Sequence, residues 1–509
     1  MNRRDFLKTL GVAAAGTTFN PSTGWPAFTE TAQQRDPEWH ILNRLGYGPR
    51  PGDVQALKQK GFETYLKEQF DPAIVAYNQS LLFPLLDKYV TLKMDVSALM
   101  TLNILDGIRA IRELDATTVI RSALGKSQLF EVMANFWSEH FSIWHFKDWD
   151  GVLKTDDDTN VIRRNTFGKF RDLLYASAKS PAMSFYLDNI ESKKEHPNEN
   201  YARELLELHT LTIGNYTEKD VKEVARCFTG WSFSYRLHSS GGGFAFFSKD
   251  HDDGEKVVLG HTIPAGGGVK DGEMVLDILA AHPATAHFIA LKLCRRFISD
   301  DPPETVVKAA ADTFLKSDGD IPTVLTTIFM SPEFASAPPK FKRPFEFVIS
   351  MMRALAVTID ADKLNSMTYL NRKYARIKAV HPGILDTLQA MGHMPHNHAT
   401  PEGYTDIAAR WETDMLERWN LTQKMVTNVL PAVSYDLDRI LQQNGVEPKV
   451  PAVLNFYANL LYGRDMTAQE QKVFTTYLDP TTDISATKRP PELLETLALM
   501  LGAPAFQWR

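Results

Sequence analysis

Two carboxylates and a guanidinium share one face of a helix that the sequence predicts over residues 198–212. On a helical projection of about 100° per residue, Arg203, Glu204 and Glu207 fall inside one arc of roughly 100°. Asn200 lies in the same arc and is a candidate substrate-binding residue. If this face opens onto a cleft, the glutamates could bridge divalent metal ions, or one could act as a general base while Arg203 holds an anionic substrate. The alternative is a solvated helix face, on which each ion pair contributes a few tenths of a kcal/mol.

A histidine among aromatic residues stands in a second predicted helix, over residues 128–146 (QLFEVMANFWSEHFSIWHF). A buried imidazole needs partners for its ring nitrogens. His140 is therefore either a core histidine bonded to a backbone carbonyl, or a metal ligand or general base that opens onto a pocket. The projection groups it with Phe136, Trp137, Phe141, Ile143 and Trp144. We expect a site between the two helices, with the catalytic residues His140, Arg203, Glu204 and Glu207.

A third candidate is the segment Met391–His398, MGHMPHNH, which combines thioether and imidazole groups. Copper prefers these donors. The alternative is a set of solvated or pocket-lining histidines. Downstream, Tyr404 and Trp411 could form an aromatic platform for a sugar or another flat ligand, although such aromatics also belong to cores. The candidate copper ligands are His393, His396 and His398.

Composition excludes several classes of protein. The chain has 509 residues, of which 44% are hydrophobic and 23% are charged, as in ordinary globular proteins. A net charge of −6 supplies no basic surface for nucleic acid, so we expect no such partner. The two cysteines, Cys227 and Cys294, could form one disulfide or remain buried thiols. The sequence contains no Walker loop, Rossmann glycine triplet, H-E-x-x-H, G-x-S-x-G or C-x-x-C.

The N-terminus predicts export. Arg3 and Arg4 begin the sequence RRDFLK, which matches the twin-arginine signal and precedes a short, weakly apolar run. We assign residues 1–35 to the signal peptide and leader. No later stretch has eighteen uninterrupted apolar residues, so we expect no transmembrane segment in the mature chain and a periplasmic or secreted location.

Apolar residues at helical spacing recur along most of the chain, which predicts a mainly α fold, a large multi-helix single body over residues 36–509. Residues 230–260 break this rhythm with short apolar runs between glycine-rich turns, and they predict a small antiparallel β insertion, either a hairpin or a three-stranded flap. We expect a C-terminal helical subdomain from about residue 380.

Several segments in order resemble an exported bacterial family catalogued as domain of unknown function number 1800. They include RLGYGPRPGDV, FWSEHFS, PNENYARELLELHTL, HPATAHFIALKL and MGHMPHNHATPEGYTD, between about residue 39 and the C-terminus. The resemblance implies a helical fold and supplies no catalytic residue. It also implies a genomic neighbour, a sulfatase-like exported family numbered 1501.

Two functions of different classes follow. The first is an exported enzyme, metal-dependent in one version, with its site between the helices 128–146 and 198–212. The second is a non-catalytic periplasmic binding or assembly partner of the sulfatase-like protein. A module that binds carbohydrate or an envelope polymer is a third possibility.

Overall fold

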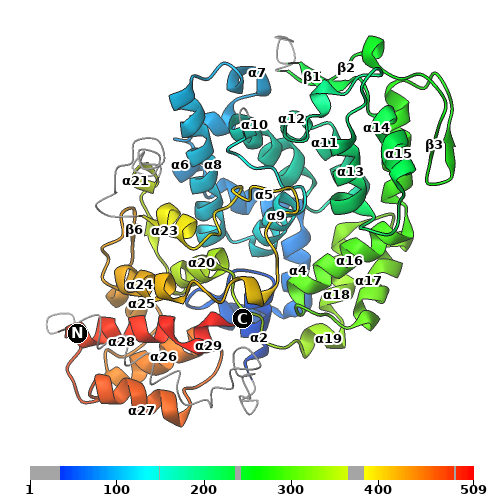
Figure 1. Ribbon diagram of the computed structural model, residues 1–509. Helices are drawn as coiled ribbons and strands as arrows, with labels where there is room; N and C mark the ends of the chain where they lie inside the picture. The colour runs from blue at the N-terminus through cyan, green and yellow to red at the C-terminus, as the bar shows by residue number, and fades with distance from the viewer. Residues whose placement is uncertain (1–34, 148–149, 235–241, 365–382, 486–488) are drawn as a thin grey trace.

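The computed structural model describes residues 35–147, 150–234, 242–364, 383–485 and 489–509 (Figure 1). Short capped helices open this part of the chain. Asp36 accepts hydrogen bonds from the backbone N–H groups of Glu38 and Trp39, and Asp71 caps a later helix in the same way. These first helices are α2 (Pro37–Arg44), α3 (Asp53–Lys60), α4 (Phe62–Phe70), α5 (Pro72–Ser80), α6 (Phe83–Leu86), the 3-10 turn η1 (Val90–Lys93) and α7 (Val96–Leu99).

The helix α8 (Ile104–Leu124) lies in the interior. Nearly every residue from Ala110 to Ala123 is buried, so other parts of the protein cover all sides of the helix there. Neighbouring helices from three parts of the sequence pack against it. They are the 3-10 turn η1, α9 (Gln128–His140), α10 (Asp150–Asp156) and, later in the chain, α20 (Pro344–Ala354). The elements that follow α10 are the π-helix η2 (Asp157–Arg163), α11 (Phe170–Ala178), α12 (Pro181–Tyr186) and the 3-10 turn η3 (Asn189–Glu191).

Both helices that the sequence assigned to the site differ from their predicted bounds. Helix α9 ends at His140, because Phe141 leaves helical geometry at φ −98° and ψ 60°. Farther along, the backbone N–H of His145 donates to the carbonyl of His396 rather than to a carbonyl of a continued helix. The second prediction, 198–212, is α13 (Glu199–Glu204) continued by the π-helix η4 (Leu205–Thr210). A π-turn rotates the following residues relative to an α-helix, so the predicted polar face does not stay aligned.

The next helix, α14 (Glu218–Cys227), agrees with its sequence signals. Thr217 and Asp220 form a capping box, and Val221 and Val224 are buried. The predicted β insertion follows, as two antiparallel hairpins. These are β1 (Trp231–Ser234) with β2 (Gly243–Phe246), and β3 (Lys256–Val258) with β4 (His261–Ile263); η5 (Ser248–Asp250) lies between them.

Helix α16 (Pro283–Phe297) begins at an N-cap, His282, that precedes Pro283. Together with α15 (Val269–Ala280) it makes a pair, bent by 61°, that has the length and composition of a broken membrane span. No single described helix is long and apolar enough to cross a membrane. The helices α17 (Glu304–Lys316), α18 (Ile321–Phe329) and α19 (Pro332–Ala335) complete this side of the molecule (Figure 1).

After α20 the chain becomes more irregular. A third small sheet pairs β5 (Thr358–Ile359) with β6 (Val433–Ser434). Between these strands, the segment 391–411 crosses α9. The elements of this region are α21 (Ala361–Leu364), α23 (Ile384–Ala390), η6 (Ala408–Arg410) and α24 (Met415–Val426).

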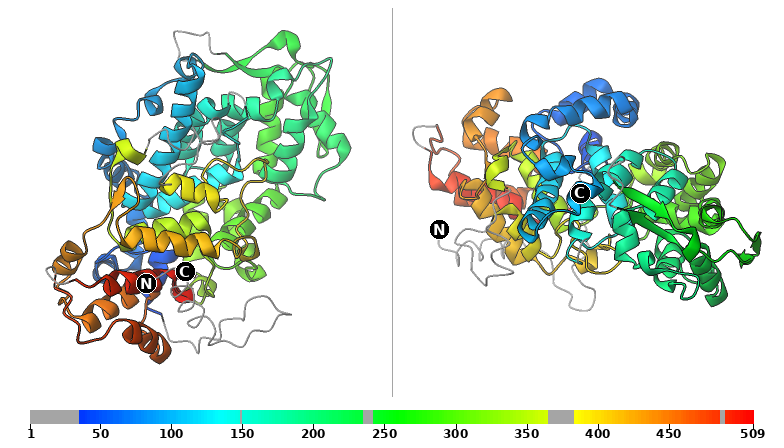
Figure 2. Two further views of the ribbon diagram at one scale, coloured as in Figure 1. Left: turned by 60° about the vertical axis from the view of Figure 1, so that its left-hand side comes forward. Right: turned by 90° about the horizontal axis from the view of Figure 1, so that it is seen from above.

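The last helices gather at one end of the molecule, beside the first one (Figures 1 and 2). Trp39 of α2 donates its indole N–H to the carbonyl of Leu460 at 2.9 Å. The boundary that we predict near residue 380 stays a prediction, and it falls in the undescribed residues 365–382. The last helices are α25 (Leu437–Gln443), α26 (Val450–Tyr462), α27 (Ala468–Tyr477), α28 (Pro491–Gly502) and α29 (Pro504–Gln507).

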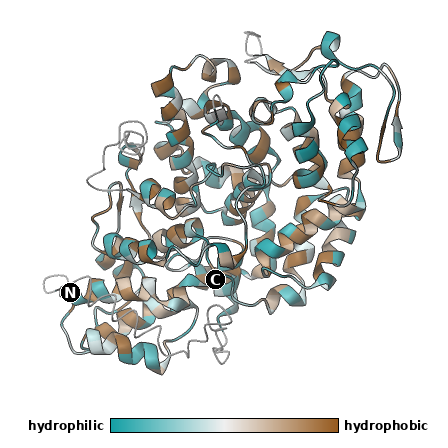
Figure 3. Ribbon diagram, in the orientation of Figure 1, coloured by the Kyte–Doolittle hydropathy of each residue, from teal (hydrophilic) through white to brown (hydrophobic). Residues whose placement is uncertain are grey.

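One hydrophobic core runs through the described residues from Leu45 to Phe506. Apolar and polar residues alternate along the helical ribbons, as expected for helices with one buried face (Figure 3). Cys227 and Cys294 are both buried and free. The mainly α fold with a small antiparallel β insertion near 230–260 is therefore confirmed.

Candidate functional site

A cavity of about 250 Å³ opens between α9, α16 and the segment Glu402–Asp406. We call it the His140 cavity. None of its lining residues comes from the β hairpins or from residues 198–212. Its lining is Phe136, Glu139, His140, Lys292, Arg295, Glu402, Gly403, Tyr404, Thr405 and Asp406.

His140 is the last residue of α9 and is 1% exposed, as the aromatic pattern predicts. Its Nε2 lies 3.1 Å from the carbonyl oxygen of His209. A carbonyl oxygen only accepts, so Nε2 carries the hydrogen and Nδ1 presents a lone pair. Burial, reinforced by the positive charge of Lys292, holds the pKa of His140 well below its usual range. The imidazole is therefore neutral at pH 7.

Lys292 of α16 approaches that lone pair: its Nζ lies 2.8 Å from Nδ1 of His140. The rings of Phe136 and Phe288 are also near the ammonium, with centroids 6.0 and 5.4 Å from Nζ. Burial lowers the pKa of Lys292 to about 8, although Glu139 and Asp406 oppose this shift. An amine with this pKa is partly neutral at physiological pH, and a neutral amine is a nucleophile and a base.

Glu139 lies beside His140 and faces both this cavity and a smaller one. Its Oε2 accepts a hydrogen bond from Arg343 at 2.6 Å, and its Oε1 lies 3.4 Å from Nε2 of His393. Burial alone would raise the pKa of the Glu139 carboxyl, but Arg343 and His393 lower it to about 2. Glu139 is therefore an anion at neutral pH.

At Gly403, the segment 391–411 passes very close to the backbone of α9. The φ of Gly403 is +71°, and a Cβ at this position would lie 2.2 Å from the carbonyl oxygen of Glu139. Only glycine meets both conditions without strain. The close approach places Tyr404 against the end of α9, where its hydroxyl donates to the carbonyl of Met394 at 2.9 Å.

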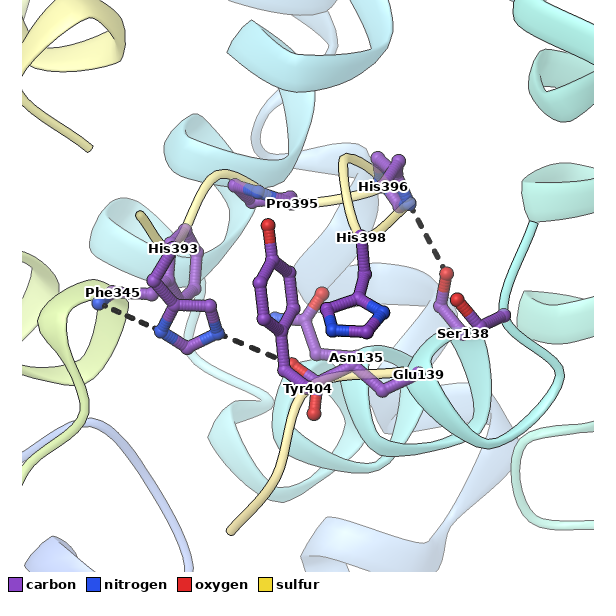
Figure 4. A pocket seen from close by; sticks show the side chains of 10 residues that line it. Asn135, Ser138, Glu139, Phe345, His393, Pro395, His396, His398 and Tyr404 are labelled. Carbon is purple, nitrogen blue, oxygen red and sulfur yellow. Dashed lines mark hydrogen bonds and ion pairs between the residues drawn. The ribbon is translucent and has the colours of Figure 1, made fainter. Parts of the chain in front are cut away.

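The three predicted copper ligands line the smaller pocket but are held apart (Figure 4). The rings of His393 and His398 lie on opposite sides of Tyr404, with centroids 4.6 and 4.8 Å from that of the tyrosine. His396 lies farther along and contacts the hydroxyls of Ser138 and Thr118 at 3.1 and 3.2 Å.

Both nitrogens of His393 are also engaged. The backbone N–H of Phe345 donates to Nδ1 at 3.3 Å, which leaves Nε2–H to donate to Glu139. Trp411 is 5% exposed and stacks on the His393 ring at 4.8 Å. Of the two aromatics predicted to bind a ligand, Tyr404 thus faces the His140 cavity, while Trp411 packs behind a histidine.

The polar face of residues 198–212 stands apart from the cavity lining. Arg203 makes a bidentate pair with Glu218 at 2.7 and 2.9 Å, and Glu207 accepts a hydrogen bond from Tyr216 at 2.6 Å. Asn200 is exposed and donates to the carbonyl of Leu187 at 3.3 Å.

Glu204 is the residue of that face whose carboxyl interacts electrostatically with the cavity lining. Burial and the neighbouring carboxylates of Glu207 and Glu402 raise its pKa, and Glu402 lines the cavity. The structure thus brings His140 to a cavity without Arg203, Glu204 or Glu207 in its wall. Throughout the described ranges, no group of three or more His, Cys, Asp or Glu side chains could hold a metal ion.

Sequence reasoning missed Glu139, Lys292 and Arg343. Glu139 is adjacent to His140 in FWSEHFS, and Lys292 stands in the basic end of HPATAHFIALKLCRRF. Adjacency to a buried histidine was the available signal for Glu139. Nothing local indicated its partner, because Arg343 is 204 residues away in the chain.

Comparison with known proteins agrees with the sequence resemblance. The family model described as "Protein of unknown function (DUF1800)" matches residues 40–508. The chain belongs to this family. Residues 1–19 of this DUF1800 member match the twin-arginine translocation signal, so it is exported by that route, to the periplasm or beyond. No curated protein and no solved structure matches it.

Proposed function

We propose that this DUF1800 protein is an exported enzyme whose active site is the His140 cavity, with Lys292 as the catalytic amine toward a carbonyl substrate. The observation that carries the proposal is the 2.8 Å contact between Nζ of Lys292 and Nδ1 of His140 in the wall of a cavity of about 250 Å³. Sites of this kind combine a cavity, convergent polar groups and a perturbed pKa.

The roles follow from the geometry. Neutral Lys292 attacks the carbonyl carbon, the resulting hydroxyl leaves as water, and an imine joins Nζ to the substrate. His140 orients the amine, because its Nε2–H is fixed on the carbonyl of His209 and its lone pair points to Nζ. The imine nitrogen takes up a proton from water, and Glu139, which holds a negative charge beside the cavity, stabilises the resulting cation. Catalytic roles for Arg203, Glu204 and Glu207, and metal binding, stay predictions from the sequence.

Reductive trapping of Lys292 tests the proposal. With acetaldehyde and cyanoborohydride at pH 7, Lys292 should be alkylated on the order of ten times faster than Lys308, measured by peptide mass spectrometry. Lys292 has a pKa of about 8 and is roughly one-tenth neutral at pH 7, whereas the hydrogen bond and charge of Asp312 raise the pKa of exposed Lys308 above its ordinary value. Lower nucleophilicity at lower pKa offsets part of this difference.

The controls are Lys292→Met and Lys308→Met. The first should remove the fast-reacting peptide without changing the circular dichroism spectrum, and the second should leave Lys292 labelling unchanged. Equal rates at the two lysines of the wild-type protein would show that Lys292 is an ordinary amine and would refute the proposal.

A second candidate function, a non-catalytic partner of the sulfatase-like exported protein, rests on a different observation. Ile104 and Leu105 begin α8 with 82% and 65% of their surface exposed, and adjacent exposed apolar residues are typical of contact surfaces. Changing both to serine should abolish co-purification with the sulfatase-like protein. Ile213→Ser is the matched control, because Ile213 is 75% exposed elsewhere in the chain. Unchanged co-purification in the double variant would eliminate this surface.

A further inference from the structure

Two cations stand side by side in the wall of the His140 cavity. Lys292 and Arg295 are three residues apart on α16, so their side chains leave the same face of the helix. Nε of Arg295 donates to the carbonyl of Asp300 at 3.0 Å. Within the part of the chain that the structure describes, neither side chain forms an ion pair with a carboxylate. The cavity therefore presents two positive charges that no acid neutralises directly.

The other cations near this cavity are compensated. Arg343 pairs with Glu139 at 2.6 Å, and Arg296 pairs with Glu346. The contrast is informative, because a half-buried charge without a partner is costly and a ligand of opposite charge would offset that cost. Arg295 is the group in this wall suited to hold a carboxylate, through the planar fork of its guanidinium.

The acids of the lining do not cancel these charges. Glu139 is held by Arg343, and Oδ1 of Asp406 lies 3.6 Å from both Arg343 and Arg296. Glu402 accepts a hydrogen bond from the hydroxyl of Thr400 at 2.6 Å and forms no ion pair with any described residue. Glu139 and Asp406 thus have cationic partners of their own, and among the described residues no acid of the lining forms an ion pair with Lys292 or Arg295.

We propose that the substrate is a small carbonyl compound that also carries a carboxylate, such as a 2-oxo acid, with its carboxylate on Arg295 and its carbonyl carbon at Lys292. This inference rests on the proposed function. Neighbouring side chains three residues apart have Cβ atoms about 5–6 Å apart, which suits a molecule whose two groups are on adjacent carbons. The cavity volume of about 250 Å³ also limits the ligand to a small molecule.

The chemical step is balanced without a further reactant. A C–N bond forms between Nζ and the carbonyl carbon, the C–O bond breaks, and the oxygen leaves as water with the two protons that the amine nitrogen gives up. No electrons are transferred. The carboxylate does not react and serves only to position the carbonyl.

The test compares glyoxylate, which has an aldehyde next to a carboxylate, with neutral acetaldehyde on the mature full chain. With cyanoborohydride at pH 7, glyoxylate should modify Lys292 about tenfold faster than acetaldehyde, after normalisation to Lys308 in the same digest. Arg295→Gln should bring the ratio of the glyoxylate rate to the acetaldehyde rate to about one. The charge of Arg295 also lowers the pKa of Lys292, so the substitution slows both reagents together, and only their ratio reports carboxylate binding. An unchanged circular dichroism spectrum shows that the variant is folded. Arg439→Gln, at an exposed arginine outside the cavity, should behave as wild type.

Each outcome has a separate meaning. Rapid labelling of Lys292 by both aldehydes at equal rates would overturn the anionic substrate while leaving the catalytic amine in place. Slow labelling by both, no faster than at Lys308, would refute the proposed function itself. Glyoxylate preference that survives in Arg295→Gln would show that another group binds the carboxylate and would overturn the role of Arg295.

Discussion

Replacing Glu346 with glutamine should lower the free energy of unfolding by about 3–5 kcal/mol, the usual cost of removing one partner from a buried ion pair. The carboxylate is 2% exposed and meets three guanidinium groups. Arg343 donates to it from Nε at 3.1 Å and from its backbone N–H at 3.0 Å, Nε of Arg509 lies 3.3 Å away, and Arg296 pairs with it as well. These contacts hold the pKa of Glu346 well below its usual range.

The loss is large because three positive charges would remain buried after the substitution. Urea unfolding followed by circular dichroism measures the change. Asp312→Asn is a suitable control, since Asp312 pairs with Lys308 on the surface and its loss should change stability little. An E346Q protein as stable as wild type would show that the arginines are solvated or rearranged and that the network does not stabilise the fold.

The Glu139→Gln variant should lose about 3 kcal/mol at pH 7, and the loss should shrink as the pH falls. The folded pKa of Glu139 is about 2, against a value of about 4.5 for an ordinary glutamate. A carboxyl with a depressed pKa stabilises the fold above its unfolded pKa, and this contribution disappears as the pH falls through the folded pKa. Each unit of pKa shift corresponds to about 1.4 kcal/mol.

The measurement is a series of urea unfolding curves for wild type and variant between pH 7 and pH 3. Their difference should be constant above about pH 5 and decrease below it. Glu402→Gln is the matched control, because Glu402 lines the same cavity and forms no ion pair with any described residue. A difference that does not vary with pH would mean that Glu139 stabilises the protein through packing rather than charge.

Export by the twin-arginine route fits this architecture. The route carries proteins that have already folded, and the ion network joins α16 to α20 and to Arg509 at the far end of the chain. Contacts this far apart in sequence form late, since the loop entropy must be lost before they stabilise anything.

The sequence predicted helix ends and burial well where both depend on residues within a turn or two. The capping box at Thr217 and Asp220 and the burial of His140 are examples. Prediction failed where the backbone leaves the α period. The π-turn at Leu205–Thr210 and the early end of α9 both changed which side chains share a face. Spacing rules assume a constant rotation per residue, and neither segment keeps it.

Export, the mainly α fold and an aromatic cage for His140 were therefore determined by the sequence alone, because local patterns encode them. Only the tertiary structure decided which groups meet that histidine. Lys292 lies 152 residues after His140 in the sequence, and Arg343, which pairs with Glu139, is separated from it by 204 residues. Such pairings depend on which helices pack together and on a glycine that lets residues 402–406 lie against α9. Periodicity can show that a charged residue is buried, but the identity of its partner is a property of the packed fold.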